Sequence, residues 1–434
     1  MNKIEYTNVP KIRNQRIKLS DWFWNLSPLI YQRKRSRQLT ETNWQQLQIL
    51  ERDHVEYCPA FPEMLELELT KACNFTCTHC GTHGSHDLHR THNRVAPMDV
   101  ALLEQLAQDV FPYLRRVYLV GEGEPFMAPR HLLLRLCRQL ERTYTFLDAC
   151  TNGALLDSEL ISAMLPVLGD ICFSLDAATQ DTYYRVRRSK AFQAVIETIK
   201  TLSNLKQTVP KDQRLFQIHL SFALRKANSS ELIEFLRMAA ELQVDGVYVR
   251  QLFVCFPSMK SESLVDKPEI FNPLIEQAIR ESEKLGLPVF LPAFIRQTPI
   301  TDSVVQEPAS TQKSQTQQEI KADPSRLKRV NCCFLWRCMN VRSTGYVFSC
   351  NAFDTPCLGN LKTTSLAEMW NGKILRDMRR RLDTTDPHPA CRRCWLREVA
   401  YFDSFDPSDS EKNFSFQGVR QPKEKAYDTS SFIA

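Results

Sequence analysis

The sequence has 434 residues, of which 43% are hydrophobic and 24% charged, and its formal net charge is +6. Such a composition is that of a globular protein large enough for more than one domain, and the small charge does not favour nucleic acid as a partner. No signal peptide is recognisable, and no window approaches the roughly 18 apolar residues that a membrane span needs. We therefore expect a cytoplasmic protein without a membrane partner.

The N-terminal part, residues 1–62, is basic and aromatic, and we interpret it as an extension whose role the sequence does not reveal. From Met64 onward, predicted strands and helices alternate regularly. The predicted strands are 65–70, 116–120, 145–150, 171–175, 216–224 and 246–253, and the predicted helices are 98–110, 131–143, 157–165, 191–205, 230–242 and 271–285. This alternation is typical of an α/β protein with a parallel sheet and helical crossovers.

The character of the chain changes after this α/β region, which we place at residues 63–297. Residues 298–329 are rich in Gln, Ser and Thr and are predicted to form a flexible polar linker. Residues 330–401 contain seven of the 15 cysteines and are predicted to form a second, smaller domain. Residues 402–434 are interpreted as a polar tail.

Three cysteines follow the first predicted strand with the spacing C-x3-C-x2-C: Cys73, Cys77 and Cys80. Because the cytosol is reducing, we expect clustered cysteines there to bind metal rather than to form disulfides. A tetrahedral zinc site or a four-iron cluster usually needs four ligands. Two interpretations follow: a structural zinc site completed by His79 or His83, or a cluster with one iron left open to a small molecule.

Short polar or glycine-containing motifs follow the next three predicted strands. They are Gly121-Glu-Gly-Glu-Pro125, Thr151-Asn-Gly153 and Ser174-Leu-Asp-Ala177. In βα-barrels the carboxyl ends of the strands carry the active site, so the cysteine triplet and these motifs are expected at one edge of the sheet. Cys150 and Cys172 fall inside predicted strands and are expected in the core.

With these motifs in register, the chain from about Met64 to Pro292 resembles the radical S-adenosylmethionine (SAM) superfamily. The resemblance implies a partial (β/α)6, TIM-like barrel. It also implies that the three cysteines hold a [4Fe-4S] cluster whose open iron is chelated by the amino and carboxylate groups of SAM. Under this resemblance Cys73, Cys77 and Cys80 are the cluster ligands.

The resemblance also implies a set of SAM-binding residues. His79 stands where an aromatic residue usually lies near the adenine, Glu124 can accept a hydrogen bond from the methionine ammonium, and Arg187 can face the SAM carboxylate. The full implied set is His79, Gly121, Gly123, Glu124, Asn152, Ser174, Asp176 and Arg187.

The second domain contains four cysteines in two pairs, Cys338 with Cys350 and Cys391 with Cys394, a set that holds zinc or an iron–sulfur cluster equally well. Together with the nearby Gly-Asn-Leu and Ser-Leu-Ala-Glu-Met-Trp-Asn stretches, it resembles the SPASM and shortened "twitch" extensions of radical SAM enzymes. Because no cysteine follows Cys394, this resemblance implies one auxiliary [4Fe-4S] cluster rather than two. The sequence does not show whether Cys332, Cys333 and Cys357 bind a cluster.

Cys255 follows the sixth predicted strand and is expected near the barrel mouth. It is interpreted either as a small buried apolar residue or as a thiol that donates a hydrogen atom to a substrate radical. The second interpretation rests on the resemblance, because some peptide epimerases of the superfamily need such a thiol.

The resemblance implies an enzyme that cleaves SAM reductively to a 5′-deoxyadenosyl radical, which then takes a hydrogen atom from the substrate. We expect a peptide or protein substrate, as in the maturation of ribosomal peptides, with epimerisation as a specific hypothesis and flavodoxin or ferredoxin as reductant. One alternative is dehydrogenation of a small alcohol or sugar. Another, from a different class, is a non-catalytic zinc protein that binds RNA or acts as a scaffold.

Overall fold

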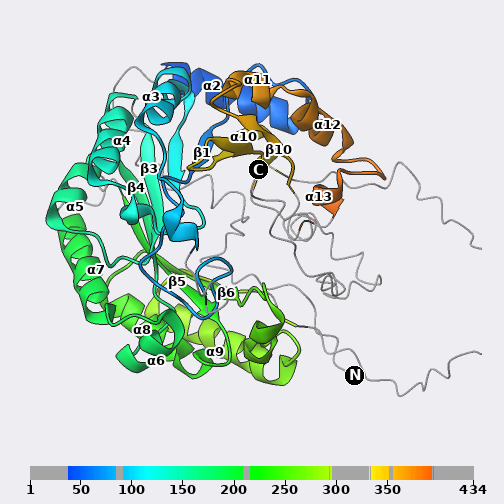
Figure 1. Ribbon diagram of the computed structural model, residues 1–434. Coiled ribbons are helices and arrows are strands. Elements are labelled where there is room, and N and C mark those ends of the chain that lie inside the picture. The colour runs from blue at the N-terminus through cyan, green and yellow to red at the C-terminus, as the bar shows by residue number, and fades with distance from the viewer. Residues whose placement is uncertain are drawn as a thin grey trace, which may run out of the picture.

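Figure 1 shows the computed structural model of the chain, which describes residues 38–84, 91–143, 145–208, 216–292, 294–295, 332, 334–350, 355–392 and 394. The predicted linker, 298–329, and the predicted tail, 402–434, lie outside the described residues. Among the helices of the described ranges, none is both long and apolar enough to cross a membrane.

A ten-stranded sheet with the order β10-β9-β8-β1-β2-β3-β4-β5-β6-β7 runs through the described chain. Strands β1 to β7 pair in parallel in chain order, so the predicted α/β fold with a partial barrel is confirmed. These strands are β1 (Met64–Leu67), β2 (Arg116–Leu119), β3 (Phe146–Thr151), β4 (Leu168–Ser174), β5 (Gln217–Leu224), β6 (Gly246–Gln251) and β7 (Val289–Phe290).

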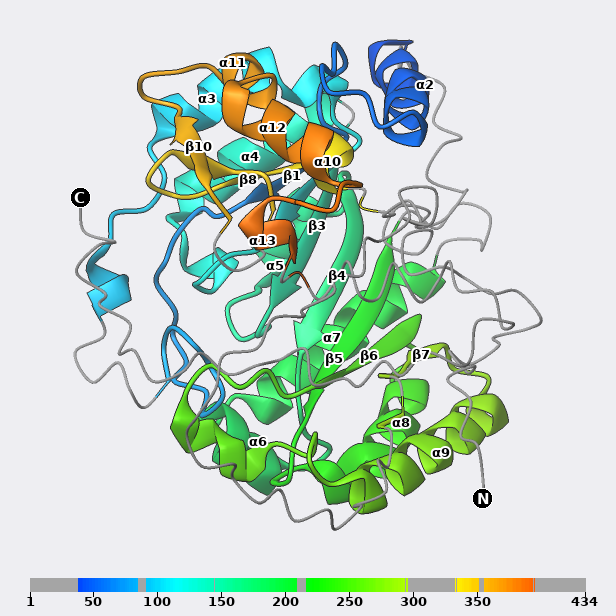
Figure 2. The ribbon, with the colours of Figure 1, turned by 90° about the vertical axis from the view of Figure 1, so that its right-hand side faces the viewer.

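Helices cover the convex side of this curved sheet, as Figures 1 and 2 show. They are α3 (Val100–Asp109), α4 (Arg130–Thr143), α5 (Ser158–Met164), α7 (Phe192–Gln207), α8 (Leu232–Glu241) and α9 (Pro268–Leu285). Side chains alternate along each strand, so Val117 and Leu119 of β2, and Val247 and Val249 of β6, are buried in the main apolar core. The residues between them face the concave side of the sheet.

Helix α6 and strand β7 are among the elements of the barrel region that were not predicted. Residues 182–187 belong to a separate short helix, α6 (Gln180–Arg187), which precedes the predicted one. Thr179 caps its start by accepting a hydrogen bond from the Thr182 amide, and Arg188 ends it in the left-handed conformation with φ 55°. The two-residue strand β7 is too short to give a periodic pattern.

The C-terminal cysteine-rich region extends the barrel's own sheet. Strand β8 (Cys338–Val341) pairs in parallel with β1, and β9 (Tyr346–Phe348) and β10 (Cys357–Asn360) follow as antiparallel strands. The described part of this region also contains the helices α10 (Phe334–Arg337), α11 (Leu366–Trp370), α12 (Lys373–Arg381) and α13 (Pro389–Arg392), which Figure 2 shows. The two regions therefore share one sheet, and the auxiliary domain is fixed beside the first barrel strand.

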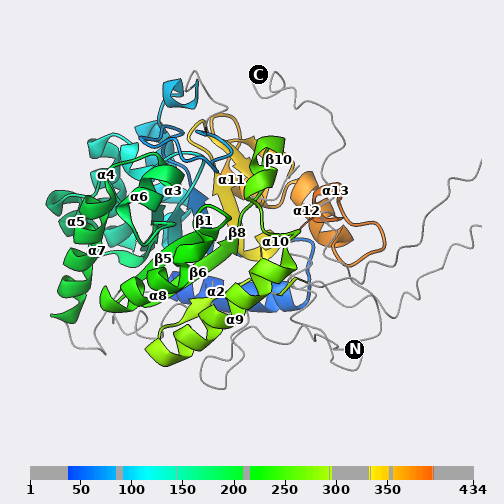
Figure 3. The same ribbon diagram turned by 90° about the horizontal axis from the view of Figure 1, so that it is seen from below.

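The described end of the N-terminal extension packs against both regions. Helix α2 (Gln38–Arg52) lies beside α10, as Figure 3 shows. The Asn43 amide group donates hydrogen bonds to the carbonyls of Phe61 and Tyr113, at 3.0 and 3.2 Å. The indole N–H groups of Trp336 and Trp370 donate to the carbonyls of Val55 and Ala60, at 2.9 and 2.7 Å. Residues 38–62 thus join the barrel to the auxiliary domain.

Candidate active site

Backbone amides of the loop after β1 donate hydrogen bonds to the sulfurs of two of its three cysteines. The Phe75 amide donates to Sγ of Cys73 at 3.4 Å, and the amides of Thr82 and His83 donate to Sγ of Cys80 at 3.4 and 3.1 Å. Amide hydrogen bonds to cysteine sulfur are one means by which proteins tune iron–sulfur clusters. The amide groups of the loop would therefore stabilise negative charge on these sulfur atoms.

Burial makes these thiols poor acids unless a cation is bound to them. Burial raises the pKa of Cys73 to about 12 and also raises the pKa of Cys77, which is almost fully enclosed. Thiolates in such a place need the positive charge of bound metal, so the donor set fits a cysteine-ligated iron–sulfur cluster. Within the described residues, no three His, Cys, Asp or Glu side chains converge on a single metal ion.

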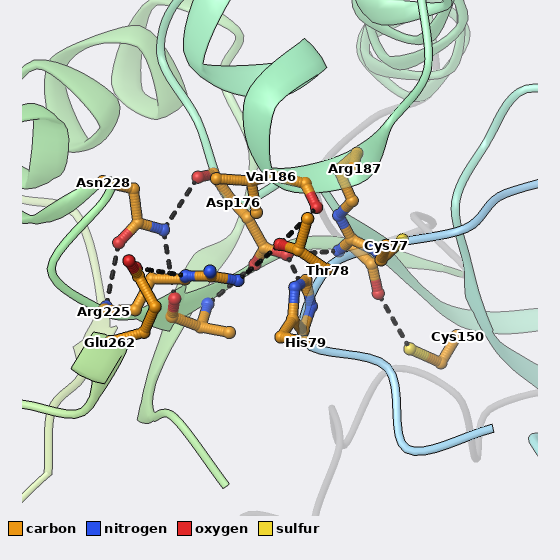
Figure 4. Close-up of polar contacts among 12 residues, drawn as sticks. Cys77, Thr78, His79, Cys150, Asp176, Val186, Arg187, Arg225, Asn228 and Glu262 are labelled. Atoms are coloured by element: carbon orange, nitrogen blue, oxygen red, sulfur yellow. Dashed lines mark hydrogen bonds and ion pairs between the residues drawn. The ribbon is translucent and has the colours of Figure 1, made fainter. Parts of the chain in front are cut away.

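A buried network surrounds the middle cysteine, as Figure 4 shows. Asp176, just after β4, has a φ of 60°, a left-handed conformation that aspartate tolerates better than most residues. Its Oδ2 lies 2.8 Å from Nη2 of Arg187 and 3.3 Å from Nε2 of His79. Although burial alone would raise the pKa of Asp176, the charge of Arg187 and the hydrogen bond from His79 lower it to about 2. Asp176 is therefore an anion next to the cysteine loop.

Arg187 connects this carboxylate to the cluster loop. Its Nη1 donates to Sγ of Cys77 at 3.6 Å, and Figure 4 shows its guanidinium between Cys77 and Asp176. Arg187 Nε and His79 Nδ1 are buried polar atoms without a hydrogen-bond partner among the described residues. Buried polar groups are normally satisfied. These two atoms lie where the resemblance places SAM, so the residues present fit that cofactor.

Glu124 joins the loops that follow β2 and β3. Its carboxylate accepts hydrogen bonds from the Thr151 hydroxyl at 2.6 Å, the Asn152 amide at 2.7 Å and the Phe126 amide at 3.3 Å. Burial raises the pKa of Glu124 to about 7 despite these three donors. Glu124 is thus a structural link as well as a candidate partner of the SAM ammonium.

The two glycines of the motif after β2 are needed because backbone and side chains approach them closely. A Cβ atom on Gly123 would lie 2.4 Å from the Ala72 carbonyl oxygen, and one on Gly121 would lie 2.6 Å from Cγ of Glu68. In the described chain, therefore, Gly123 contacts the backbone of the cysteine loop. The Glu124 amide adds a hydrogen bond of 2.8 Å to the same carbonyl of Ala72.

Asn152 and Ser174 complete the predicted SAM-binding set. The Asn152 side chain donates to Oδ1 of Asn74 at 2.8 Å and so reaches the cysteine loop. The Ser174 hydroxyl lies 3.5 Å from Sγ of Cys150. The structure therefore gathers the motifs after β1, β2, β3 and β4 at one edge of the sheet.

Cys255 also lies against the cysteine loop. A Cβ atom on Gly81, the residue after Cys80, would lie 2.9 Å from Sγ of Cys255. Burial raises the pKa of the Cys255 thiol, which is half-buried. The thiol is thus protonated at neutral pH, the form that can give up a hydrogen atom.

The predicted auxiliary ligands have different surroundings. Cys338 lies on β8, is fully buried and packs with Met64, whereas Cys350, Cys391 and Cys394 are half-buried. Of the cysteines left unassigned, Cys332 packs partly against the main core and Cys357 is exposed, whereas Cys333 lies outside the described residues.

Two residues that hold the site in place, Glu68 and Arg225, were not predicted from the sequence. Glu68, at the end of β1, accepts hydrogen bonds from the Ser343 hydroxyl at 3.0 Å and the Glu122 amide at 3.0 Å, which links the auxiliary domain to the motif after β2. Arg225, after β5, donates to the Thr78 hydroxyl at 2.8 Å and is paired with Glu262 at 3.1 Å, as Figure 4 shows. These contacts join residues far apart in the chain, and no local motif marks them.

Cys172 is buried, as expected of a core residue, and Cys150 is partly buried. Cys150 and Cys172 are register partners on β3 and β4, and they face the concave side together with Asp148 and Asp170 rather than the apolar core under the helices. The alternation of side chains places them there, because Ala149 and Ile171 take the apolar positions between. The concave face near the site is polar and carries thiols.

This arrangement fits an enzyme class that uses an iron–sulfur cluster and SAM, and comparison with known families agrees. The model of the radical SAM superfamily matches residues 67–239, and that of an iron–sulfur cluster-binding domain, SPASM, matches residues 332–395. The chain belongs to the radical SAM superfamily and has a C-terminal SPASM domain. The family implies a [4Fe-4S] cluster with SAM in the barrel and auxiliary iron–sulfur ligation in the SPASM domain.

Curated relatives are similar at low identity. A tungsten-containing aldehyde ferredoxin oxidoreductase cofactor-modifying protein of Pyrococcus furiosus is 23% identical over 342 residues, 78% of this chain and 88% of that protein. A probable GTP 3′,8-cyclase of Saccharolobus solfataricus is 29% identical over 191 residues, 44% of this chain. The match spans only 57% of the length of the cyclase.

Solved structures share the fold. SuiB of Streptococcus suis bound to S-adenosylmethionine has a TM-score of 0.52 at 14% identity and covers 83% of this chain and 76% of its own. SuiB bound to the precursor peptide SuiA has a TM-score of 0.50 at 13% identity, covering 77% of this chain and 70% of its own.

Proposed function

We propose that this radical SAM enzyme modifies a peptide or protein substrate at an unactivated C–H bond. When bound, a reduced [4Fe-4S] cluster and SAM supply a 5′-deoxyadenosyl radical that takes a hydrogen atom from the substrate. The observation that carries the proposal is the convergence of Cys77, Arg187 and Asp176 at the mouth of the barrel. Cys73, Cys77 and Cys80 are the proposed ligands of the cluster.

The residues around the cysteine loop would position the cofactor. Arg187 and His79 have buried nitrogen atoms available for polar groups of SAM, and Glu124 fixes the loop that would meet its ammonium. The other proposed contacts are Gly121, Gly123, Asn152, Ser174 and Asp176. Because Glu124, Asp176 and Arg187 are buried, their charges act in a low-dielectric setting, where positioned groups have most effect on a reaction.

The SPASM domain is proposed to hold one auxiliary [4Fe-4S] cluster on Cys338, Cys350, Cys391 and Cys394. Its strand β8 lies directly beside β1, and Arg342 pairs with Glu68 at 3.2 Å. A cluster there would lie on the rigid extension of the barrel sheet. The electron source is proposed to be a cytoplasmic flavodoxin or ferredoxin.

A peptide substrate is supported by the shared fold with SuiB, which has been seen with a precursor peptide. A small-molecule substrate is the second candidate, and the relative from Pyrococcus furiosus, whose name describes cofactor modification, favours it. In the peptide case we propose epimerisation, in which the Cys255 S–H gives a hydrogen atom to the peptide radical on the face opposite to abstraction. One electron from the reductant and a proton from water then convert the remaining Cys255 thiyl radical back to the thiol. The placement of Cys255 against Gly81 supports this role.

The test is a reaction in deuterium oxide under anaerobic conditions, with a short peptide encoded next to the gene as substrate. We expect one solvent deuterium per modified residue, because the Cys255 S–H exchanges with water. Cys255→Ala should still form 5′-deoxyadenosine but should lose the epimerised product, and Cys137→Ala, on α4, serves as a matched cysteine control. Undiminished epimerisation by Cys255→Ala would reject the donor role. Turnover of a small alcohol but of no peptide would reject the peptide function.

A further inference from the structure

The concave face of the barrel carries a polar surface on which most charged groups already have partners. Arg116 of β2 is paired with Asp148 of β3. His219 of β5 lies 2.9 Å from Asp170 of β4. Acidic side chains on this face are thereby matched within the protein, and Glu66 of β1 likewise accepts a hydrogen bond of 2.9 Å from the Asn340 amide group.

Arg250 of β6 differs from these residues. It is exposed, whereas Tyr248, two residues earlier on the same face, is buried. Its guanidinium carbon lies 5.8 Å from the centroid of the Tyr248 ring, and Arg250 makes no hydrogen bond or ion pair in the part of the chain that the structure describes. Tyr248 in turn stacks on Phe290, with 5.2 Å between the ring centroids, so the ring beneath the Arg250 guanidinium is itself held by packing.

Arg250 lies near the carboxyl end of β6, at the same edge of the sheet as the cysteine loop. Its register partner on β5 is Ala223, and the Ala223 amide donates to Oδ1 of Asp176 at 2.7 Å. Arg250 is therefore level with the Asp176–Arg187 network. Its charge also reaches Cys150 on β3: the pKa of Cys150 is lowered chiefly by a hydrogen bond with Cys172 and further by the charge of Arg250.

We propose that Arg250 binds a carboxylate of the substrate inside the barrel. This inference deepens the proposed function, because it adds an acidic group to the substrate near the C–H bond that reacts. A planar guanidinium binds a carboxylate through two parallel hydrogen bonds, which fixes orientation as well as position. Fixing an anion level with Asp176 would hold the substrate across the barrel mouth.

The source of the carboxylate is either an acidic residue of a peptide or a small-molecule acid, and one experiment separates them. Full-length protein, purified anaerobically with its clusters, is treated with phenylglyoxal, and modification of each arginine is followed by mass spectrometry. Four probes are compared: SAM, glutarate, a pool of random heptapeptides with a central Glu, and the matched pool with Gln. Arg138, exposed on the outer helix α4 and without an ion pair among the described residues, is the control arginine.

We expect the Glu pool to slow modification of Arg250 by about threefold once its concentration reaches about twice the Kd, and the Gln pool to have no effect. Modification of Arg138 should not change with any probe. Protection by glutarate without protection by the Glu pool would uphold the carboxylate site but reject a peptide substrate. Equal protection by the two pools, protection by SAM alone, or no protection would overturn the inference.

Two variants check that the effect needs the guanidinium. Arg250→Gln should abolish the difference in affinity between the Glu and Gln pools, measured by calorimetry on the same anaerobic protein. Arg250→Lys keeps the charge but not the two-pronged geometry, and it should keep only part of that difference. Iron content equal to that of the parent protein shows that each variant is folded. A full preference for the Glu pool in Arg250→Gln would contradict the proposal.

Discussion

Arg187 and Asp176 form a buried ion pair, with 2.8 Å between Nη2 and Oδ2, and the same guanidinium donates to Sγ of Cys77. The pair couples the loop after β4 to the cysteine loop after β1. Because neither charge is fully solvated, removing one partner leaves the other uncompensated. The electrostatics of the cluster and the binding of SAM are therefore expected to depend on this contact.

Replacing Arg187 should make the barrel cluster harder to reduce. A positive charge beside Cys77 stabilises the more negative, reduced cluster. Loss of this charge-assisted contact in Arg187→Gln should lower the midpoint potential by about 50–100 mV. For a one-electron couple, a tenfold change in the equilibrium constant corresponds to about 59 mV. Redox titration followed by electron paramagnetic resonance measures this. Arg185→Gln, on the exposed side of α6, should leave the potential unchanged, and an unchanged potential in Arg187→Gln would contradict the assignment.

Glu124 should make the cluster-free protein less stable as the pH rises. Burial raises its pKa from an ordinary 4.5 to about 7 in the folded state, so the folded protein binds more protons than the unfolded chain between these values. The free energy of unfolding should therefore fall as the pH rises through this window, by up to about 3 kcal/mol. Thermal unfolding between about pH 5 and about pH 8 tests this against Glu124→Gln, which should show less of the decline. Equal slopes for the two proteins would refute it.

Gly123→Ala should disrupt the cysteine loop. The new Cβ would meet the carbonyl oxygen of Ala72 at 2.4 Å, a contact that requires backbone movement. We expect loss of most of the iron bound after anaerobic reconstitution. Gly286→Ala is the matched control, because it adds a methyl group in open space at a positive φ of 62° and should cost about 1 kcal/mol of stability without loss of iron. Full iron content in Gly123→Ala would show that the loop tolerates the shift.

Arg225 should protect the cluster through Thr78. The 2.8 Å hydrogen bond between them holds the segment between Cys77 and Cys80. Arg225→Ala should speed the loss of cluster absorbance in air several-fold, and Thr78→Val, which removes only the hydroxyl, should speed it less. Arg237→Ala, on the exposed face of α8, is a control that should behave like the parent protein. Decay at the parental rate in both site variants would rule out this support.

The sequence contains most of the local chemistry of the site but little of its tertiary support. Cys73, Gly123 and Glu124 belong to short motifs that follow strands, and the shared edge of parallel strands brings them together. The parallel pairing of β8 with β1, and the Arg225–Thr78 contact, join segments distant along the chain without a periodic signal. Arg250 was missed because an arginine after alternating valines reads as an ordinary strand end.

The most direct test of the account is 5′-deoxyadenosine formation by anaerobically purified protein given SAM and dithionite. We expect iron and sulfide consistent with a [4Fe-4S] cluster in the barrel and another in the SPASM domain, and nucleoside formation above a protein-free control. Cys77→Ser should abolish the nucleoside, whereas Cys58→Ser, a buried cysteine outside the site, should not. Zinc in place of iron, with no 5′-deoxyadenosine, would contradict the central claim.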